Sequence, residues 1–168
     1  HDTSHPGEPQ NNGIIERANG DVLAMTRTAL IAAGIPNYAW PFASRCVTFN
    51  DNCSWEEEGE SSWAKCHGRG EFDGQLLPFG CAVWFLPSTT KSKRDKAPSR
   101  VKPKWGGNAT IGIFAGYVTT VACGWSGRYL VWSLDAFAGM DLTASANGKS
   151  THASGLKLSL IHISEPTR

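Results

Sequence analysis

Residues 9–19 read Pro-Gln-Asn-Asn-Gly-Ile-Ile-Glu-Arg-Ala-Asn, and they mark the point where a loop changes into a long helix. The segment before position 10 contains two prolines and a glycine, which disfavour helix and favour turns. The asparagine side chains can accept hydrogen bonds from the first free N–H groups of the helix. Gly34 and Pro36 together are typical of a helix end. We therefore predict a helix over residues 14–33, about 30 Å long.

Apolar residues recur along this helix at the spacing of a single face, which predicts that this face is buried. They are Ile15, Ala18, Val22, Met25, Ala29 and Ala32. Glu16 and Asn19 lie one turn apart on a different face. A glutamate in the first turn often only stabilises the helix dipole. The alternative is that a rigid helix presents the Glu16 carboxylate to a large ligand.

The string Pro-Gln-x-Asn-Gly-x-x-Glu-Arg-x-Asn resembles the last catalytic block of copia-type retrotransposon integrases, and the resemblance covers about residues 3–142. It implies that residues 1–50 are the helical C-terminal end of an RNase H-like catalytic core. Glu16 then matches the third member of the Asp-Asp-Glu metal-binding triad of that family. Asn12 matches a loop position that approaches the DNA end, and Asn19 matches a polar helix residue beside the DNA backbone.

The resemblance implies DNA strand transfer with two metal ions, one activating the attacking oxygen and the other stabilising the leaving oxygen. Hard oxygen ligands suit Mg²⁺ or Mn²⁺. In this family the two aspartates lie upstream, and neither Asp2 nor Asp21 matches them. One carboxylate cannot hold a metal pair, so we expect the parent polyprotein to be an enzyme and this fragment alone to be inactive. The implied partners are element and target DNA, other Pol segments, and further copies in an oligomer.

A second helical pattern covers residues 38–50, with Trp40, Ala43, Cys46 and Val47 on one face. We favour core packing for Trp40 over stacking on a nucleic-acid base. Residues 51–75 form a connector, in which Ser61 and Gly68 bracket a short capped helix.

The period changes to that of strands near Leu76. Apolar runs at 77–87, 110–118 and 127–134 are separated by glycine-rich turns, which favours a small antiparallel barrel or sandwich over 76–136. Phe79-Gly80-Cys81 and the motif Gly-Ile-Phe-Ala-Gly-Tyr at 112–117 resemble blocks that follow the copia-type integrase core. The resemblance implies that this unit is an SH3-like β-barrel. The expected fold class is therefore α+β.

Two C-terminal segments stand apart from these patterns. Residues 137–157 are rich in Ser, Thr, Ala and Gly and have too few large apolar groups to fold alone. Residues 158–168 resemble the translated sequence of a sequencing-library adapter. We therefore expect 158–168 to lie outside the fold.

Charge is strongly segregated, although the net charge is only +1. Residues 91–104 hold seven of the 16 basic residues and a single acid: Lys91, Lys93, Arg94, Lys96, Arg100, Lys102 and Lys104. Such a segment can bind DNA phosphates without reading sequence, or it can be a solvated connection. Both interpretations stay open.

The five cysteines include no Cys-x-x-Cys pair, so we expect reduced and mostly buried thiols. The adjacent Cys66 and His67 lack the spacing of a zinc hydrolase or thiol enzyme, and we expect His67 to be a surface or capping residue. There is no signal peptide or membrane-spanning run, so we expect an intracellular protein, in the nucleus or a cytoplasmic particle. A fragment of a DNA-integrating enzyme is the favoured function. The alternatives are a non-catalytic DNA-binding β module and a decayed transposon remnant.

Overall fold

The computed structural model describes residues 13–54, 59–68, 70–86, 109–121 and 124–138, together with the backbone of 158–161. The helices are α1 (Gly13–Ala33), α2 (Trp40–Cys53) and α3 (Ser62–His67), with short 3₁₀ helices at Asn37–Ala39 and Leu134–Phe137. The strands are β1 (Ala82–Phe85), β2 (Thr110–Thr119), β3 (Trp125–Ser133) and β4 (Leu158–Ile161). The expected α+β class is confirmed. No helix of this described part is long and apolar enough to cross a membrane.

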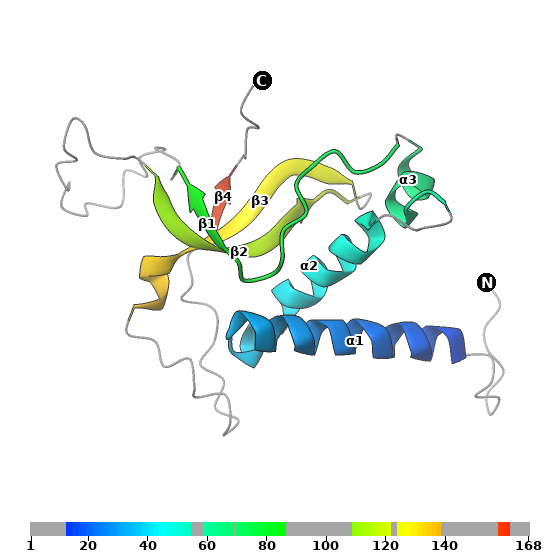
Figure 1. Cartoon of the computed structure of the whole chain (residues 1–168), viewed down its shortest axis with the longest axis horizontal. Helices are drawn as coiled ribbons and strands as arrows, with labels where there is room; N and C mark the ends of the chain where they lie inside the picture. Colours follow the sequence, from blue (N-terminus) through cyan, green and yellow to red (C-terminus); the bar gives the residue numbers. More distant parts are fainter. Residues whose placement is uncertain are drawn as a thin grey trace.

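The first two helices form where the sequence predicts them. α1 ends at Gly34, whose N–H donates to the Ile31 carbonyl at 3.1 Å, and the Ile35 N–H donates to the Leu30 carbonyl at 3.2 Å. This closes the last turn and carries the chain into α2, where a proline is tolerated in the first turn. α1 packs along α2, as Figure 1 shows.

Only the C-terminal half of α1 is buried. Thr26 and Leu30 are buried, while Val22, Met25 and Ala29 are partly buried, so the predicted stripe is confirmed at these last three positions. It is wrong at Ile15, Ala18 and Ala32, which are exposed. For Ile15 and Ala18 the physical reason is visible in Figure 1, where the first turns of α1 extend beyond the helices and strands that pack on its other end. Ala32 is in the last turn and lines an open hollow between α1 and α2.

The prediction that Trp40 packs in the core is wrong, because 59% of its surface is exposed. The predicted face of α2 is confirmed at Ala43 and Cys46, is partly buried at Val47, and continues through Phe49 and Cys53. Trp40 stands at the first position of α2, and the 100° step between neighbouring helix residues sets it beside this face rather than on it.

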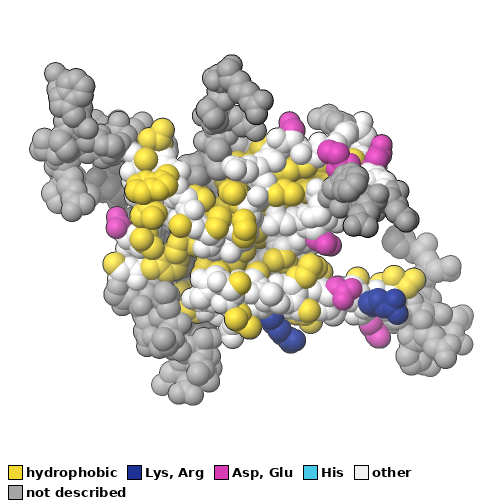
Figure 2. All heavy atoms as spheres, viewed as in Figure 1, with side chains coloured by type: hydrophobic (Ala, Val, Ile, Leu, Met, Phe, Trp, Pro, Cys, Tyr) yellow, Lys and Arg dark blue, Asp and Glu magenta, His cyan; other side chains and the backbone are white. Residues whose placement is uncertain are grey.

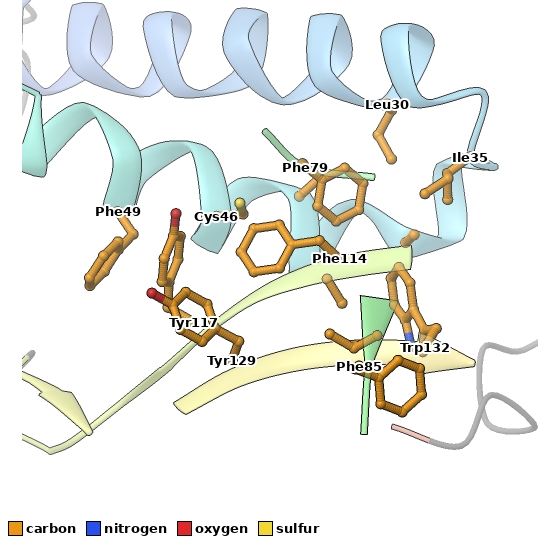
Figure 3. Packing of buried hydrophobic residues seen from close by; sticks show 14 of the residues in the cluster. Leu30, Ile35, Cys46, Phe49, Phe79, Phe85, Phe114, Tyr117, Tyr129 and Trp132 are labelled. Carbon is orange, nitrogen blue, oxygen red and sulfur yellow. The ribbon is translucent and has the colours of Figure 1, made fainter. Parts of the chain in front are cut away.

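The four strands form one antiparallel sheet in the order β1-β2-β3-β4. The β2–β3 ladder shifts register between Phe114 and Gly116 and between Tyr117 and Thr119. α2 packs on β2, so helices and sheet share one hydrophobic core (Figure 3). Leu30, Cys46, Phe114 and Trp132 all belong to this core.

Within the described residues the sheet is open, and it does not close into the SH3-like barrel that the resemblance implies. β1 and β4 are its two edges, and they do not pair with each other. A short β1 of four residues offers little edge for closure, and α2 covers part of the sheet instead. A helix packed on an open sheet therefore describes this unit.

Residues 158–161 are not outside the fold, contrary to the expectation for 158–168. They form β4, with Leu158 opposite Trp132 and Ile161 opposite Tyr129 on β3. The physical reason is general: a strand at the edge of a sheet presents unpaired N–H and C=O groups, which any extended apolar segment can pair. An adapter-like origin of these residues does not prevent such pairing.

The Phe79-Gly80-Cys81 block is a joint between α1 and the sheet. Gly80 adopts a left-handed φ of 79°, and a Cβ placed there would collide with the Cβ of Ala33 on α1. The Gly80 N–H donates to the Phe114 carbonyl, and the Phe114 N–H donates to the Cys81 carbonyl, both at 2.9 Å. Phe79 is buried, and its ring centroid lies 6.1 Å from that of Trp132. The block thus fixes the end of α1 to β2.

Candidate functional site

The first turns of α1 present Glu16 and Asn19 on an exposed surface. They are three residues apart on the helix, so their side chains lie on the same side of it, one turn apart. A shallow hollow of about 310 Å³ at the same end of α1 is lined by Gly13, Ile14, Arg17, Ala18 and Asp21, and it lies on another face of the helix than Glu16 and Asn19. No neighbouring element of the described chain covers this end of the helix (Figure 1). Glu16 is therefore free to meet a ligand or another protein segment.

The exposed apolar residues of α1 lie at the same end. Ile14 is 86% exposed and Ile15 is 61% exposed. Figure 2 shows hydrophobic side chains beside basic and acidic ones at the free end of the helix. An amphipathic helix normally carries polar residues on the face that meets water, so the stability of α1 in water does not explain two large exposed isoleucines in its first turn. This end of α1 therefore resembles a surface that packs against another protein segment.

Glu16 has no partners for a metal site within the described residues. These contain no group of three or more His, Cys, Asp or Glu side chains that could hold a metal ion. Asp21 is exposed on the same helix. The two-metal centre that the resemblance implies therefore does not fit this chain alone.

The other predicted DNA-binding residues lie outside the described residues: Asn12, Lys91, Lys93, Arg94, Lys96, Arg100, Lys102 and Lys104. The place where their segment joins the fold is known, because Phe85 pairs with Thr110 across β1 and β2. Residues 91–104 thus belong to the connection between two neighbouring strands. In Figure 1 this end of the sheet and the start of α1 lie at opposite ends of the long axis.

Sequence reasoning missed a larger hollow, about 490 Å³, between α2, α3 and β2. Its walls include Phe49, Trp63 and Tyr117, and its rim includes Arg45 and Thr119. These positions come from three elements, of which β2 is far from α2 and α3 in the chain. The short helix α3 is held in place by Ser61, whose hydroxyl accepts from the Ala64 N–H at 3.2 Å and whose own N–H donates to Glu71 at 3.1 Å.

His67 has a structural position in α3. Its Nδ1 lies 2.9 Å from the Trp63 carbonyl, which accepts only if Nδ1 carries the proton. The imidazole stacks on the Trp63 ring at 3.9 Å, and Nε2 is buried without a hydrogen-bond partner among the described residues. Nδ1 is therefore engaged with the backbone of the last turn of α3. Of the two expectations for His67, surface or capping, this contact agrees with the capping one.

The cysteines divide by burial. Cys46 and Cys53 are buried, and burial raises the pKa of each thiol to about 12. Cys81 is partly buried and its pKa is raised for the same reason, whereas Cys66 is exposed. Buried, protonated thiols are poor nucleophiles. The expectation of mostly buried thiols agrees with Cys46, Cys53 and Cys81, while Cys66 is the exposed exception and Cys123 lies outside the described residues.

Two named proteins share part of this sequence. The Retrovirus-related Pol polyprotein from transposon RE2 of Arabidopsis thaliana is 30% identical over 101 residues, and the one from transposon RE1 of the same plant is 31% identical over 101 residues. Over this part the chain is similar to retrotransposon Pol polyproteins. The aligned part is 58% of this chain and 7% of either relative. No protein-family model matches the chain, and no solved structure matches it.

Proposed function

We propose that this chain is a fragment of a retrotransposon integrase, from the end of the catalytic core into the following β unit. The observation that carries the proposal is the free first half of α1, which presents Glu16 and Asn19 next to exposed Ile14 and Ile15. The relatedness to Pol polyproteins supports it. In the parent protein, the upstream part of an RNase H-like core would cover the two isoleucines. The open sheet would be what this chain retains of an SH3-like unit.

Glu16 supplies one carboxylate to a Mg²⁺ or Mn²⁺ centre in the parent protein, and two upstream aspartates supply the others. Asn12 and Asn19 lie beside the DNA end in this proposal. The basic residues of segment 91–104 bind phosphates of element or target DNA. Other Pol segments and further copies of the integrase complete the assembly, in the nucleus or in a cytoplasmic particle. Without these additions, the fragment has no strand-transfer activity.

The decisive experiment replaces Glu16 by Gln in the full-length parent protein and measures joining of a DNA end to target DNA in magnesium. Gln keeps the shape of the side chain and removes the negative charge. Loss of a metal ligand should abolish joining, whereas loss of a helix-dipole partner costs only about 0.3–1 kcal/mol of stability.

Asp21→Asn is the matched control, because Asp21 is an exposed carboxylate on the same helix with no assigned role. We expect this variant to join DNA ends at close to the wild-type rate. Near wild-type joining by Glu16→Gln would show that Glu16 is structural and that the integrase assignment of α1 is wrong.

A non-catalytic DNA-binding β module is the second candidate. It is favoured by the concentration of seven basic residues in the connection between β1 and β2. The affinity of this chain for duplex DNA should then fall steeply as the salt concentration rises. In a plot of log affinity against log salt concentration, the slope should become shallower by about 0.9 for each phosphate contact removed. Replacing Lys91, Lys93 and Arg94 by Gln should flatten the slope. An unchanged slope would mean that the connection is only solvated.

A further inference from the structure

The hollow between α2, α3 and β2 has the size of a small-ligand site and no part in the proposed strand-transfer chemistry. Its volume of about 490 Å³ falls within the range in which proteins bind small molecules and cofactors. Eleven described residues line it, and they come from α2, α3 and β2. The question is which chemical class of ligand it fits.

The inner wall is aromatic and rigid. Phe49 and Tyr117 stack at 4.2 Å with an interplanar angle of 21°, and Phe49 meets Trp63 edge-on at 5.3 Å. Trp63 in turn stacks with His67. These rings hold one another in place, so the wall exists before any ligand arrives. A flat aromatic ligand gains stacking energy from such a wall at little cost in ordering.

As far as the described residues show, the rim is polar and carries one positive charge, that of Arg45. Arg45 is exposed, and its guanidinium donates to the Thr119 hydroxyl at 3.3 Å, which orients it at the mouth of the hollow. Asn52 and three hydroxyl residues, Ser44, Thr48 and Ser62, complete the rim. Among the described residues, no carboxylate lines the hollow. A planar guanidinium among neutral donors suits an anion such as a phosphate, which it can bind with two parallel hydrogen bonds.

We propose that this hollow binds one unstacked nucleotide of single-stranded DNA, with the base against the aromatic wall and its phosphate at Arg45. The inference rests on the proposed function only for the identity of the polymer as DNA. Aromatic wall and single cation together favour a nucleotide over an apolar peptide side chain, which would have no use for the charge. Base stacking of this kind is tolerant of sequence. The site therefore positions a frayed or displaced strand and does not read its bases.

The test uses the full chain and an eight-nucleotide oligothymidine with a fluorescent label, followed by anisotropy at low salt. Arg45→Gln should weaken binding about tenfold or more, the usual effect of losing a hydrogen bond to a charged group. Arg45→Lys should weaken it less, because it keeps the charge and loses only the planar fork. Arg27→Gln is the matched control, since Arg27 is an equally exposed arginine on α1. It should bind like the wild type.

A second measurement locates the base. The same oligonucleotide with one 5-iodouracil should crosslink on irradiation to the peptide that contains Trp63. All four proteins should unfold at the same urea concentration, because both arginines are exposed.

Equal binding by Arg45→Gln and the control, or crosslinks confined to other peptides, would overturn the nucleotide site and leave the integrase proposal intact. Absence of any binding would overturn it as well. Displacement of the oligonucleotide by a leucine-rich peptide would show instead that the hollow takes a protein side chain. The Glu16→Gln joining assay on the parent protein is independent of all these outcomes, so failure of either proposal can be told from failure of the other.

Discussion

Tyr117 joins the sheet to α2 and to the loop before β1, and its hydroxyl is the point of contact. The hydroxyl donates to Asn50 Oδ1 at 2.8 Å and accepts from the Leu77 N–H at 2.8 Å. Asn50 closes the triangle by donating from Nδ2 to the Leu77 carbonyl at 3.0 Å. The ring is buried and stacks on Phe49. Three segments that are far apart in the chain are therefore held by one hydroxyl group.

Replacing Tyr117 by Phe should lower the free energy of unfolding by about 2–3 kcal/mol. The ring and its packing remain, so no cavity forms, but Asn50 Oδ1 and the Leu77 N–H each lose a partner. An unpaired buried polar group costs about 1–3 kcal/mol. Asn50 and Leu77 are only partly buried, which places each at the lower end of that range.

Urea unfolding followed by tryptophan fluorescence measures this loss. With a denaturant slope of about 1.5 kcal/mol per molar urea, the midpoint should fall by about 1–2 M. Tyr38→Phe is the control, because the Tyr38 hydroxyl has no hydrogen-bond partner among the described residues while the ring is partly buried. A midpoint for Tyr117→Phe equal to that of the control would refute the reasoning. So would full additivity of Tyr117→Phe with Asn50→Ala, since the two residues share one bond.

Three further predictions concern the fold. Gly112→Ala should destabilise the chain by about 1–3 kcal/mol, because the new Cβ would lie 2.5 Å from Val131 Cγ1 and 2.6 Å from the Trp132 carbonyl oxygen. Gly20→Ala, in open space on α1, should stabilise it by about 0.5–1 kcal/mol. Equal urea midpoints for the two variants would contradict both predictions. Burial raises the pKa of Cys53 to about 12. The folding stability that the protonated Cys53 thiol contributes is therefore complete below its ordinary pKa near 9 and is lost as pH rises from there towards 12. Cys53→Ala should reduce this alkaline loss of stability, and Cys66→Ala, at an exposed thiol, should not. Deleting residues 158–168 should speed amide hydrogen exchange along β3 and leave α1 unchanged, whereas unchanged exchange in β3 would restore the expectation that these residues lie outside the fold.

The helices were predictable from sequence because their signals are local. The apolar period, the glycine and proline after α1, and the Ser61 cap of α3 all act within a few residues. Which half of α1 is buried was not predictable in the same way. That depends on where α2 crosses it, and the crossing is fixed by the packing of Gly80 on Ala33 and of Leu30 in the common core.

The strands were predictable as apolar runs, but their arrangement was not. A closed barrel and an open sheet share the same period of two, and the difference lies in which edges meet. The nucleotide-sized hollow had no signal in the sequence. Arg45, Trp63 and Thr119 are ordinary residues in their own elements, and only the packing of α2 on β2 and α3 brings them together.

The sequence blocks that carry the resemblance to copia-type integrases differ in the contacts that they make within this chain. Phe79-Gly80-Cys81 and the 112–117 motif lie at the joints between helices and sheet, where Gly80, Phe114 and Tyr117 make close contacts that other side chains would disturb. Their residue types follow from packing and hydrogen bonding alone. Glu16 makes no such contact, because it stands on the free end of α1. Packing within this chain therefore gives no reason for a glutamate at that position. The helix dipole gives one, and under the proposed function metal binding gives another, which the Glu16→Gln joining assay tells apart from the first.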